Sequence, residues 1–191
     1  IELDYISSDL CGSEKSSLFS IMPADFGWKW LPQDFMYVRC ENCELLYLNP
    51  RPKPEHLFEY YNEETIQTED FVKGHVSAYF HNYIKGKKYH VKNAQLELKK
   101  IENFKNPGRL LEIGCAAGFF LNEAKKNGWE VYGVEPSKNF VLYANEKLEL
   151  NVELGTLEKA NFPKYFFDAV VHFDLISHLF SPSETFKSIN R

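Results

Sequence analysis

The chain has 191 residues, a formal net charge of −5 at pH 7 and an ordinary globular composition, with 44% hydrophobic and 26% charged residues. This length supports one sizeable domain with a smaller appendage, and no apolar run is long enough to cross a membrane. The negative charge argues against nucleic acid as the main partner. Four unevenly spaced cysteines do not make a secreted disulfide framework, so we expect a cytoplasmic protein without nucleic-acid or membrane partners.

Residues 1–53 form a short, turn-rich segment that ends in the stiff run Pro50, Pro52, Pro54. Within it, "CENC" at 40–43 is a C-x-x-C pair, which is half of a typical zinc ribbon. The other half is "SSDLCG", where Cys11 is present and Ser8 stands three residues earlier. We predict Cys11, Cys40 and Cys43 as metal ligands. Water, Asp9 or Asp4 could complete the site, or packing alone could maintain it without metal.

Residues 54–107 are predicted to be mainly helical. "PEHLFEYY" at 54–61 has proline at a plausible first helical position. "KKYHVKNAQLELKKIENF" at 87–104 carries Val91, Ala94, Leu98 and Ile101 at helical spacing. The "NPG" at 106–108 ends this helical part.

From residue 108 the pattern changes to alternating strands and helices. The predicted strands are "RLLEIG" (109–114), "WEVYGVE" (129–135), "NVELG" (151–155) and "FDAVVHFD" (167–174). The predicted helices are "FFLNEAKKNG" (119–128), closed by Gly128, "SKNFVLYANEKLEL" (137–150), capped by Ser137, and "SPSETFKSINR" (181–191). This order predicts an α/β fold, with a Rossmann-like parallel sheet covered by helices on both faces.

The stretch "LLEIGCAAGFFL" at 110–121 places a glycine-containing turn between a strand and a helix, so backbone N–H groups can approach a ligand there. Dinucleotide enzymes use G-x-G-x-x-G, but the third glycine position is Phe119 here, which disfavours a nicotinamide dehydrogenase. The spacing G-x-A-x-G suits a ligand without a phosphate. Glu135 ends the next strand, 21 residues after Gly114, where a carboxylate accepts hydrogen bonds from a ribose diol. Together these features indicate S-adenosylmethionine.

With "GVEPS" and "FDAVVHFDLISHL", this stretch resembles the class I S-adenosylmethionine-dependent methyltransferases over residues 109–191. The resemblance implies loop residues around the methionine part of the cofactor, a carboxylate on the ribose, the turn from Gly155 to Leu157 beside the adenine, and the segment from Asp174 to Ile176 along the cofactor's edge. The predicted cofactor-binding residues are Glu112, Gly114, Cys115, Ala116, Gly118, Glu135, Pro136, Thr156, Leu157, Asp174 and Leu175.

Methyl transfer requires mainly positioning and desolvation, and a base only where the acceptor loses a proton early. His178 follows a strand's carboxyl end and is the predicted catalytic base; Tyr60, Tyr61 and Tyr79 are weaker candidates. The resembled family usually has Glu-His where this chain has Ser177 and His178. Many members also begin with a zinc ribbon, and "CENCELLYLNPRP" keeps that pattern.

The resembled family has a core of seven strands in the order 3-2-1-4-5-7-6, of which this chain supplies four. We therefore expect the chain to be a fragment of a longer protein, or the uncovered edge of its fourth strand to pair with another copy. The leading hypothesis is a methyltransferase acting on a small molecule such as a sugar or natural-product intermediate. The alternative is a non-catalytic, methyltransferase-like binding or interaction protein.

Overall fold

The computed structural model of the chain describes residues 2–22, 34–56 and 76–190, with side chains in the last range from Phe80 onward. A helical turn begins at Pro54, as expected, but the rest of the helix predicted over 54–61 lies outside the described residues. The same is true of Tyr60, Tyr61 and the side chain of Tyr79. The chain forms two units, Ile1–Glu59 with Phe180–Ser183, and Tyr60–Leu179 with Glu184–Arg191. The division predicted at 53 and 107 remains a prediction.

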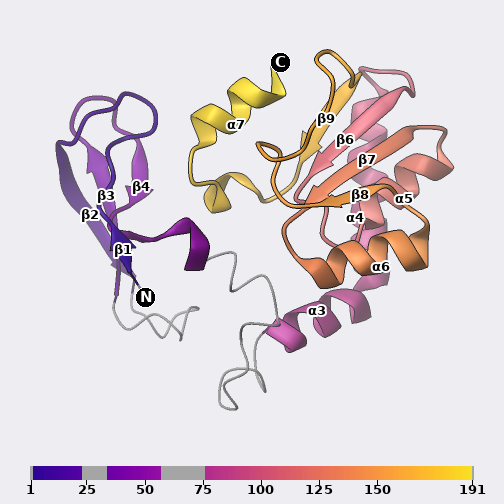
Figure 1. Cartoon of the computed structure of the whole chain (residues 1–191), viewed down its shortest axis with the longest axis horizontal. Coiled ribbons are helices and arrows are strands. Elements are labelled where there is room, and N and C mark those ends of the chain that lie inside the picture. The colour runs from indigo at the N-terminus through magenta and orange to yellow at the C-terminus, as the bar shows by residue number, and fades with distance from the viewer. Residues whose placement is uncertain (1, 23–33, 57–75, 191) are drawn as a thin grey trace. The chain divides into compact units, whose positions relative to one another are not determined.

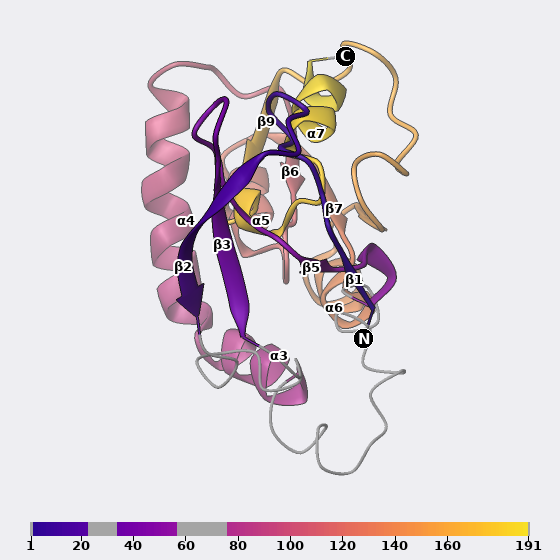
Figure 2. The same ribbon diagram turned by 90° about the vertical axis from the view of Figure 1, so that its left-hand side faces the viewer.

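The first unit is built from two small antiparallel sheets. The pair is β1 (Leu3–Asp4) with β5 (Arg51–Pro52), and the three-stranded sheet has the order β2 (Ser16–Met22), β3 (Phe35–Cys40), β4 (Leu46–Leu48). Figure 2 shows β2 and β3 side by side. In the register of the two strands, Ser16 pairs with Cys40. The central strand β3 therefore ends at the first cysteine of the C-x-x-C pair, and both Val38 and Cys40 are buried.

The second unit contains a four-stranded parallel sheet in the order β8-β7-β6-β9 (Figure 1). Its strands are β6 (Arg109–Ile113), β7 (Glu130–Glu135), β8 (Val152–Leu154) and β9 (Ala169–His172). This order is the 3-2-1-4 half of the expected core, and β9 lies at an edge of the described sheet. The observed β8 and β9 are shorter at both ends than the strands predicted from the sequence.

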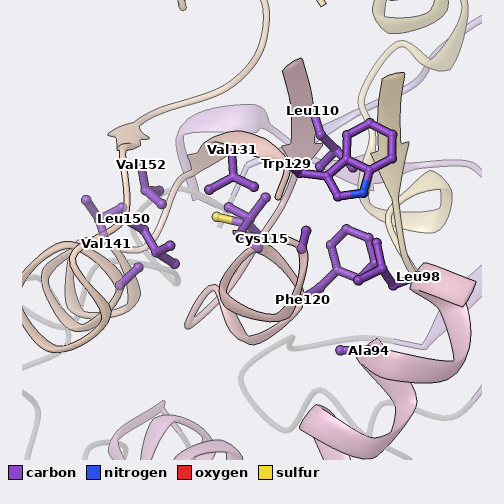
Figure 3. Packing of buried hydrophobic residues seen from close by; sticks show 13 residues of the cluster. Ala94, Leu98, Leu110, Cys115, Phe120, Trp129, Val131, Val141, Leu150 and Val152 are labelled. Carbon is purple, nitrogen blue, oxygen red and sulfur yellow. The ribbon is translucent and has the colours of Figure 1, made fainter. Parts of the chain in front are cut away.

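Helices cover both faces of this sheet, which confirms the predicted architecture. The helices from residue 76 onward are α3 (Val76–Lys85), α4 (Lys87–Glu102), α5 (Phe119–Lys126), α6 (Lys138–Leu148) and α7 (Pro182–Ile189). Of these, α3 packs against α5 and α6. On one face, residues of α4, α5 and α6 pack with β6, β7 and β8 around Leu110 and Phe120 (Figure 3). On the other, Ile189 of α7 packs with Leu111 and Val170, because successive strand residues point to opposite faces.

Phe119, which occupies the third glycine position of a dinucleotide loop, belongs to an aromatic cluster. Its ring is 2% exposed and stacks parallel to Tyr83, with centroids 5.8 Å apart. Tyr83 also stacks on His90 at 3.9 Å, and Phe140 of α6 meets Tyr83 edge to face. A large ring thus fills the helix start where dinucleotide enzymes need a glycine, which agrees with the exclusion made from the sequence.

One predicted helix start differs in detail from the structure. Ser137 is the N-cap residue of α6, but its side chain makes no capping hydrogen bond. Instead its backbone N–H donates to Oε1 of Glu135 at 2.9 Å. The carboxylate at the end of β7 therefore fixes the backbone of the residue at which α6 begins.

Candidate functional site: a glycine loop over two buried carboxylates

The loop between β6 and α5 has a left-handed backbone at three positions. The φ angles are +71° at Gly114, +45° at Ala116 and +73° at Gly118. The N–H of Gly114 donates to the carbonyl of Val134 at 2.8 Å, which ties the loop to β7. Because left-handed φ is costly for residues with a Cβ, the turn itself favours glycine at 114 and 118, whereas Ala116 adopts this backbone at a cost in strain.

Close packing adds a second requirement for glycine. A Cβ on Gly118 would lie 2.5 Å from Cδ1 of Leu150, and one on Gly114 would lie 3.1 Å from Cδ1 of Leu175. Sequence reasoning missed Gly133 on β7, where a Cβ would lie 2.7 Å from Sγ of Cys115. A glycine inside an apolar strand is the signal that could have revealed this close approach.

Glu135 ends β7 beneath this loop and is 6% exposed. Its Oε2 accepts the N–H of Ala116 and its Oε1 the N–H of Ser137, both at 2.9 Å. Burial raises the pKa of Glu135 to about 7, although the two backbone donors favour the charged form. The carboxylate is therefore poised between its two protonation states near neutral pH and holds the glycine loop by its backbone.

Glu112 on β6 is the second buried carboxylate and is 5% exposed. Its Oε2 has no hydrogen-bond partner, a condition it shares only with Oη of Tyr47 among the buried side-chain nitrogen and oxygen atoms of the described residues. Burial, and then the charge of Glu135, raise the pKa of Glu112 well above its ordinary value. Burial and the same two glutamates also raise the pKa of Cys115, so that this thiol is not an activated nucleophile. An unpartnered buried carboxylate oxygen is costly, and a donor brought by a ligand would satisfy it.

The remaining predicted cofactor residues follow the carboxyl ends of β7, β8 and β9, where ligands of open parallel sheets bind. Pro136 lies between Glu135 and Ser137, and the N–H of Gly155 donates to the carbonyl of Glu135 at 2.9 Å. Thr156 is half-buried and Leu157 buried in that turn. These contacts bring the end of β8 to the end of β7.

The segment after β9 carries Asp174, Leu175 and His178. Asp174 has a left-handed φ of +51°, and Leu175 reaches over Gly114. A 3₁₀ turn over Ile176–His178 follows, in which the N–H of His178 donates to the carbonyl of Leu175 at 2.8 Å. Ser177 and His178 are both exposed. His178 thus lies on the same short segment as a residue that touches the glycine loop.

The first unit brings the three predicted metal ligands together. The thiols of Cys11, Cys40 and Cys43 all lie within 4.8 Å of one another, and Sγ of Cys11 is 3.6 Å from Sγ of Cys40. Hydrogen bonds from the side chain of Asn42 and the backbone of Ser13 lower the pKa of Cys11 to about 6. A hydrogen bond from the backbone of Cys43 lowers the pKa of Cys40. Soft sulfur ligands at this separation suit zinc, which binds thiolates.

Ser8 lies at the fourth side of this cluster, fully buried, with its Oγ 3.3 Å from Sγ of Cys43. The two carboxylates considered as alternative ligands lie elsewhere. Asp9 is hydrogen-bonded to Ser181 and Ser183, and no carboxylate of the described residues joins the three thiols within reach of one metal ion. Asp9 and Asp4 are therefore excluded as ligands in this conformation.

Comparison with known protein families finds a match for the sheet region of the second unit. Residues 111–191 match the family model described as a methyltransferase domain. No curated protein sequence matches the chain with significance. The family match therefore covers the segment that holds the glycine loop, both predicted cofactor-binding carboxylates and His178.

Solved structures with a similar arrangement include the PH0226 protein of Pyrococcus horikoshii OT3, with 26% identity, a TM-score of 0.49, and coverage of 54% of this chain and 52% of that chain. A SAM-dependent methyltransferase from Thermotoga maritima shows 26% identity, a TM-score of 0.48, and coverage of 58% and 51%. Another from Archaeoglobus fulgidus shows 24% identity, a TM-score of 0.46, and coverage of 57% and 52%. This chain spans about half the length of these solved structures.

The family match gives the class of domain that this region resembles: residues 111–191, which carry the glycine loop and its two buried carboxylates, match the model of a methyltransferase domain. In the described part of the chain, no helix combines the length and apolar character needed to span a membrane.

Proposed function

We propose that the protein is an S-adenosylmethionine-dependent methyltransferase that acts on a small-molecule acceptor. The observation that carries this proposal is the unpartnered Oε2 of the buried Glu112, beside the loop that Glu135 holds. A buried acceptor of this kind matches a cationic donor, and the amino group of the cofactor's methionine part is such a donor.

The residues present fit the cofactor. Glu112 would accept from the amino group, Glu135 from the ribose diol, and the turn at Thr156 and Leu157 would lie beside the adenine. The cofactor supplies a methyl group already activated on a sulfonium sulfur. The chain's own part is to bind and orient, with Leu175 closing over Gly114 and His178 available to accept a proton from the acceptor.

Calorimetric titration with S-adenosylhomocysteine tests this proposal. We expect Glu135→Ala to weaken binding by roughly 1–3 kcal/mol, the range for a charged hydrogen-bond partner that is removed. Glu130→Ala is the matched control, because Glu130 is an exposed acid at the opposite end of the same strand. Equal affinities for both variants and the wild type would reject the placement of the ribose, and binding of NADH in place of S-adenosylhomocysteine would reject the cofactor.

Ser177 favours one alternative, a non-catalytic methyltransferase-like binding protein, because the resembled family usually has a glutamate there. The two hypotheses differ in turnover and agree on cofactor binding. A screen of small-molecule methyl acceptors with the complete gene product distinguishes them: formation of S-adenosylhomocysteine supports the enzyme, and binding without turnover of any acceptor class supports the alternative.

We also propose that Cys11, Cys40 and Cys43 hold one zinc ion, with the fourth position taken by water or by the Ser8 hydroxyl. The clustering of three thiols around a fully buried serine supports this assignment. Metal analysis of protein purified without chelator should give one equivalent of zinc, and Cys43→Ser should lower this stoichiometry. A zinc-free wild type with the same thermal stability after zinc addition would reject it.

Two further proposals concern the setting of the protein. Free cysteines among the described residues fit a reducing, cytoplasmic location.

The edge strand β9, of apolar and β-branched sequence, fits association with a second copy. Light scattering after size-exclusion chromatography tests the second proposal: a dimer is expected, and a monomer at all concentrations would contradict it.

A further inference from the structure

The cysteine loop at residues 8–11 carries an acidic side chain that does not face the thiols. The loop backbone is fixed by the N–H of Gly12, which donates to the carbonyl of Ser8 at 2.7 Å. From this loop, Oδ1 of Asp9 accepts the hydroxyl of Ser181 at 2.7 Å, and Oδ2 accepts the N–H of Ser183 at 2.7 Å. The loop that supplies a predicted metal ligand therefore also binds a segment near the end of the chain.

Ser183 is in the first turn of α7, where N–H groups lack acceptors within the helix. Asp9 supplies the acceptor from 174 residues away in the sequence, and its negative charge suits the helix start. A second side chain of the same unit holds Phe180, three residues before Ser183. Nη1 of Arg51 donates to the carbonyl of Phe180 at 2.5 Å, and the guanidinium lies over the Phe180 ring. Residues 180–183 are thus held by two N-terminal side chains.

The other end of this segment belongs to the candidate site. Leu175 reaches over Gly114, and His178 is bonded through its N–H to the carbonyl of Leu175. Only Leu179 separates His178 from Phe180. Residues 180–183 therefore follow directly, in the chain, the segment that carries Leu175 and His178.

We propose that Asp9 and Arg51 are positioning residues for the segment Leu175–Ser183, and that zinc at the cysteine cluster orders this segment through Asp9. The role of the segment in cofactor binding rests on the proposed function, but the ordering itself does not. The ordering follows from one short loop, residues 8–11, which supplies Cys11 as a metal ligand and Asp9 as the acceptor for Ser183 of α7.

Hydrogen–deuterium exchange of the full chain without cofactor tests the proposal. Wild type, Asp9→Ala and Glu41→Ala are compared with zinc and with chelator. Glu41 is the matched control, since it is an exposed acid next to Cys40 in the other cysteine loop. In the wild type, zinc should slow exchange of amides 176–186 by about tenfold, the effect expected for fixing a helix cap. Glu41→Ala should keep this effect, and Asp9→Ala should lose it while still binding zinc.

Asp9→Asn, which retains one acceptor oxygen, should show an intermediate effect and guards against misfolding of the alanine variant. Zinc protection of 176–186 that is equal in wild type and Asp9→Ala would overturn the proposal, as would its absence in the wild type. Titration with S-adenosylhomocysteine forms a separate arm. If zinc orders the segment but no cofactor binds, the proposed function fails and the positioning role stands.

Discussion

A single unpartnered oxygen on Glu112 carries much of the functional interpretation, and it leads to a test that separates binding from stability. Glu112→Gln keeps the size of the side chain and prevents it from ionising when the cationic amino group of the ligand binds. We expect S-adenosylhomocysteine affinity to fall by about tenfold, because the charge-assisted hydrogen bond can no longer form. The free energy of unfolding should stay the same or rise, since the oxygen has no partner in the free protein. Calorimetry and urea unfolding measure the two quantities.

Glu123→Gln provides the opposite pattern as a control. Glu123 is equally buried, but its carboxylate is satisfied by Lys126 and Gln95. Its replacement should lower the free energy of unfolding by about 1 kcal/mol and leave cofactor affinity unchanged. If both variants lose stability and neither loses affinity, Glu112 is a structural residue and the proposed function loses its main support.

Ser8 offers a second test at a single residue. A thiol at this position would complete four sulfur ligands, so Ser8→Cys should bind zinc at least about tenfold more tightly than the wild type. Competition with a chromophoric chelator measures this affinity. Ser8→Ala shows whether the hydroxyl itself is a ligand. An unchanged affinity in Ser8→Cys would mean that position 8 does not face the metal.

The two glycines at the ends of α5 allow a matched comparison of strain and packing. Both have left-handed φ, +73° at Gly118 and +91° at Gly128. A Cβ on Gly128 would meet nothing within 4 Å, whereas on Gly118 it would meet Leu150 at 2.5 Å and Ala144 at 3.2 Å. Gly128→Ala should therefore lose about 1–2 kcal/mol of unfolding free energy from strain alone. Gly118→Ala should lose about 1–3 kcal/mol more, from overpacking, as measured by urea unfolding. Equal losses would contradict the packing role.

The strands and helices of the sheet region were predictable because local patterns and burial agree there. Leu98 falls on the buried side of α4 at the predicted helical spacing, and the alternation of strands and helices predicts the parallel sheet. The order of its strands was expected only from the resemblance to the methyltransferases. Ser137 is the N-cap residue of α6, as predicted, but the sequence did not reveal that its side chain makes no capping hydrogen bond. A propensity for capping describes the serine alone and does not include the contact of its backbone N–H with Glu135.

Across the whole molecule, contacts between distant parts of the sequence set the limit of prediction. The sequence pattern grouped Cys11, Cys40 and Cys43, and the structure places their thiols within 4.8 Å of one another, because the C-x-x-C spacing and the matching S-x-x-C are local signals. It offered Asp9 as a metal ligand, and the structure assigns that carboxylate to Ser183. The sequence shows that Asp9 is acidic, but the group that it contacts depends on how distant parts of the chain fold together.

The buried carboxylates make the stability of the whole molecule depend on pH. Glu135 has a pKa of about 7 in the folded protein, against an ordinary value of 4.5. The folded state therefore binds this proton more tightly than the unfolded state, and the resulting stabilisation is fully present below pH 4.5 and lost as the pH rises through about 7. Glu112 acts in the same direction, whereas the lowered pKa of Asp168 affects stability only in more acidic solution.

Comparison of the wild type with Glu135→Gln isolates this contribution, because other groups that titrate in the same range, such as Cys11 and His90, cancel in the difference. Between pH 5 and pH 8, the unfolding free energy of the wild type should fall relative to the variant by on the order of 3 kcal/mol, from the pKa difference. Urea unfolding of zinc-free protein at several pH values measures it. A difference that is constant or rises with pH would show that Glu135 is ionised throughout, with its two backbone donors outweighing its burial.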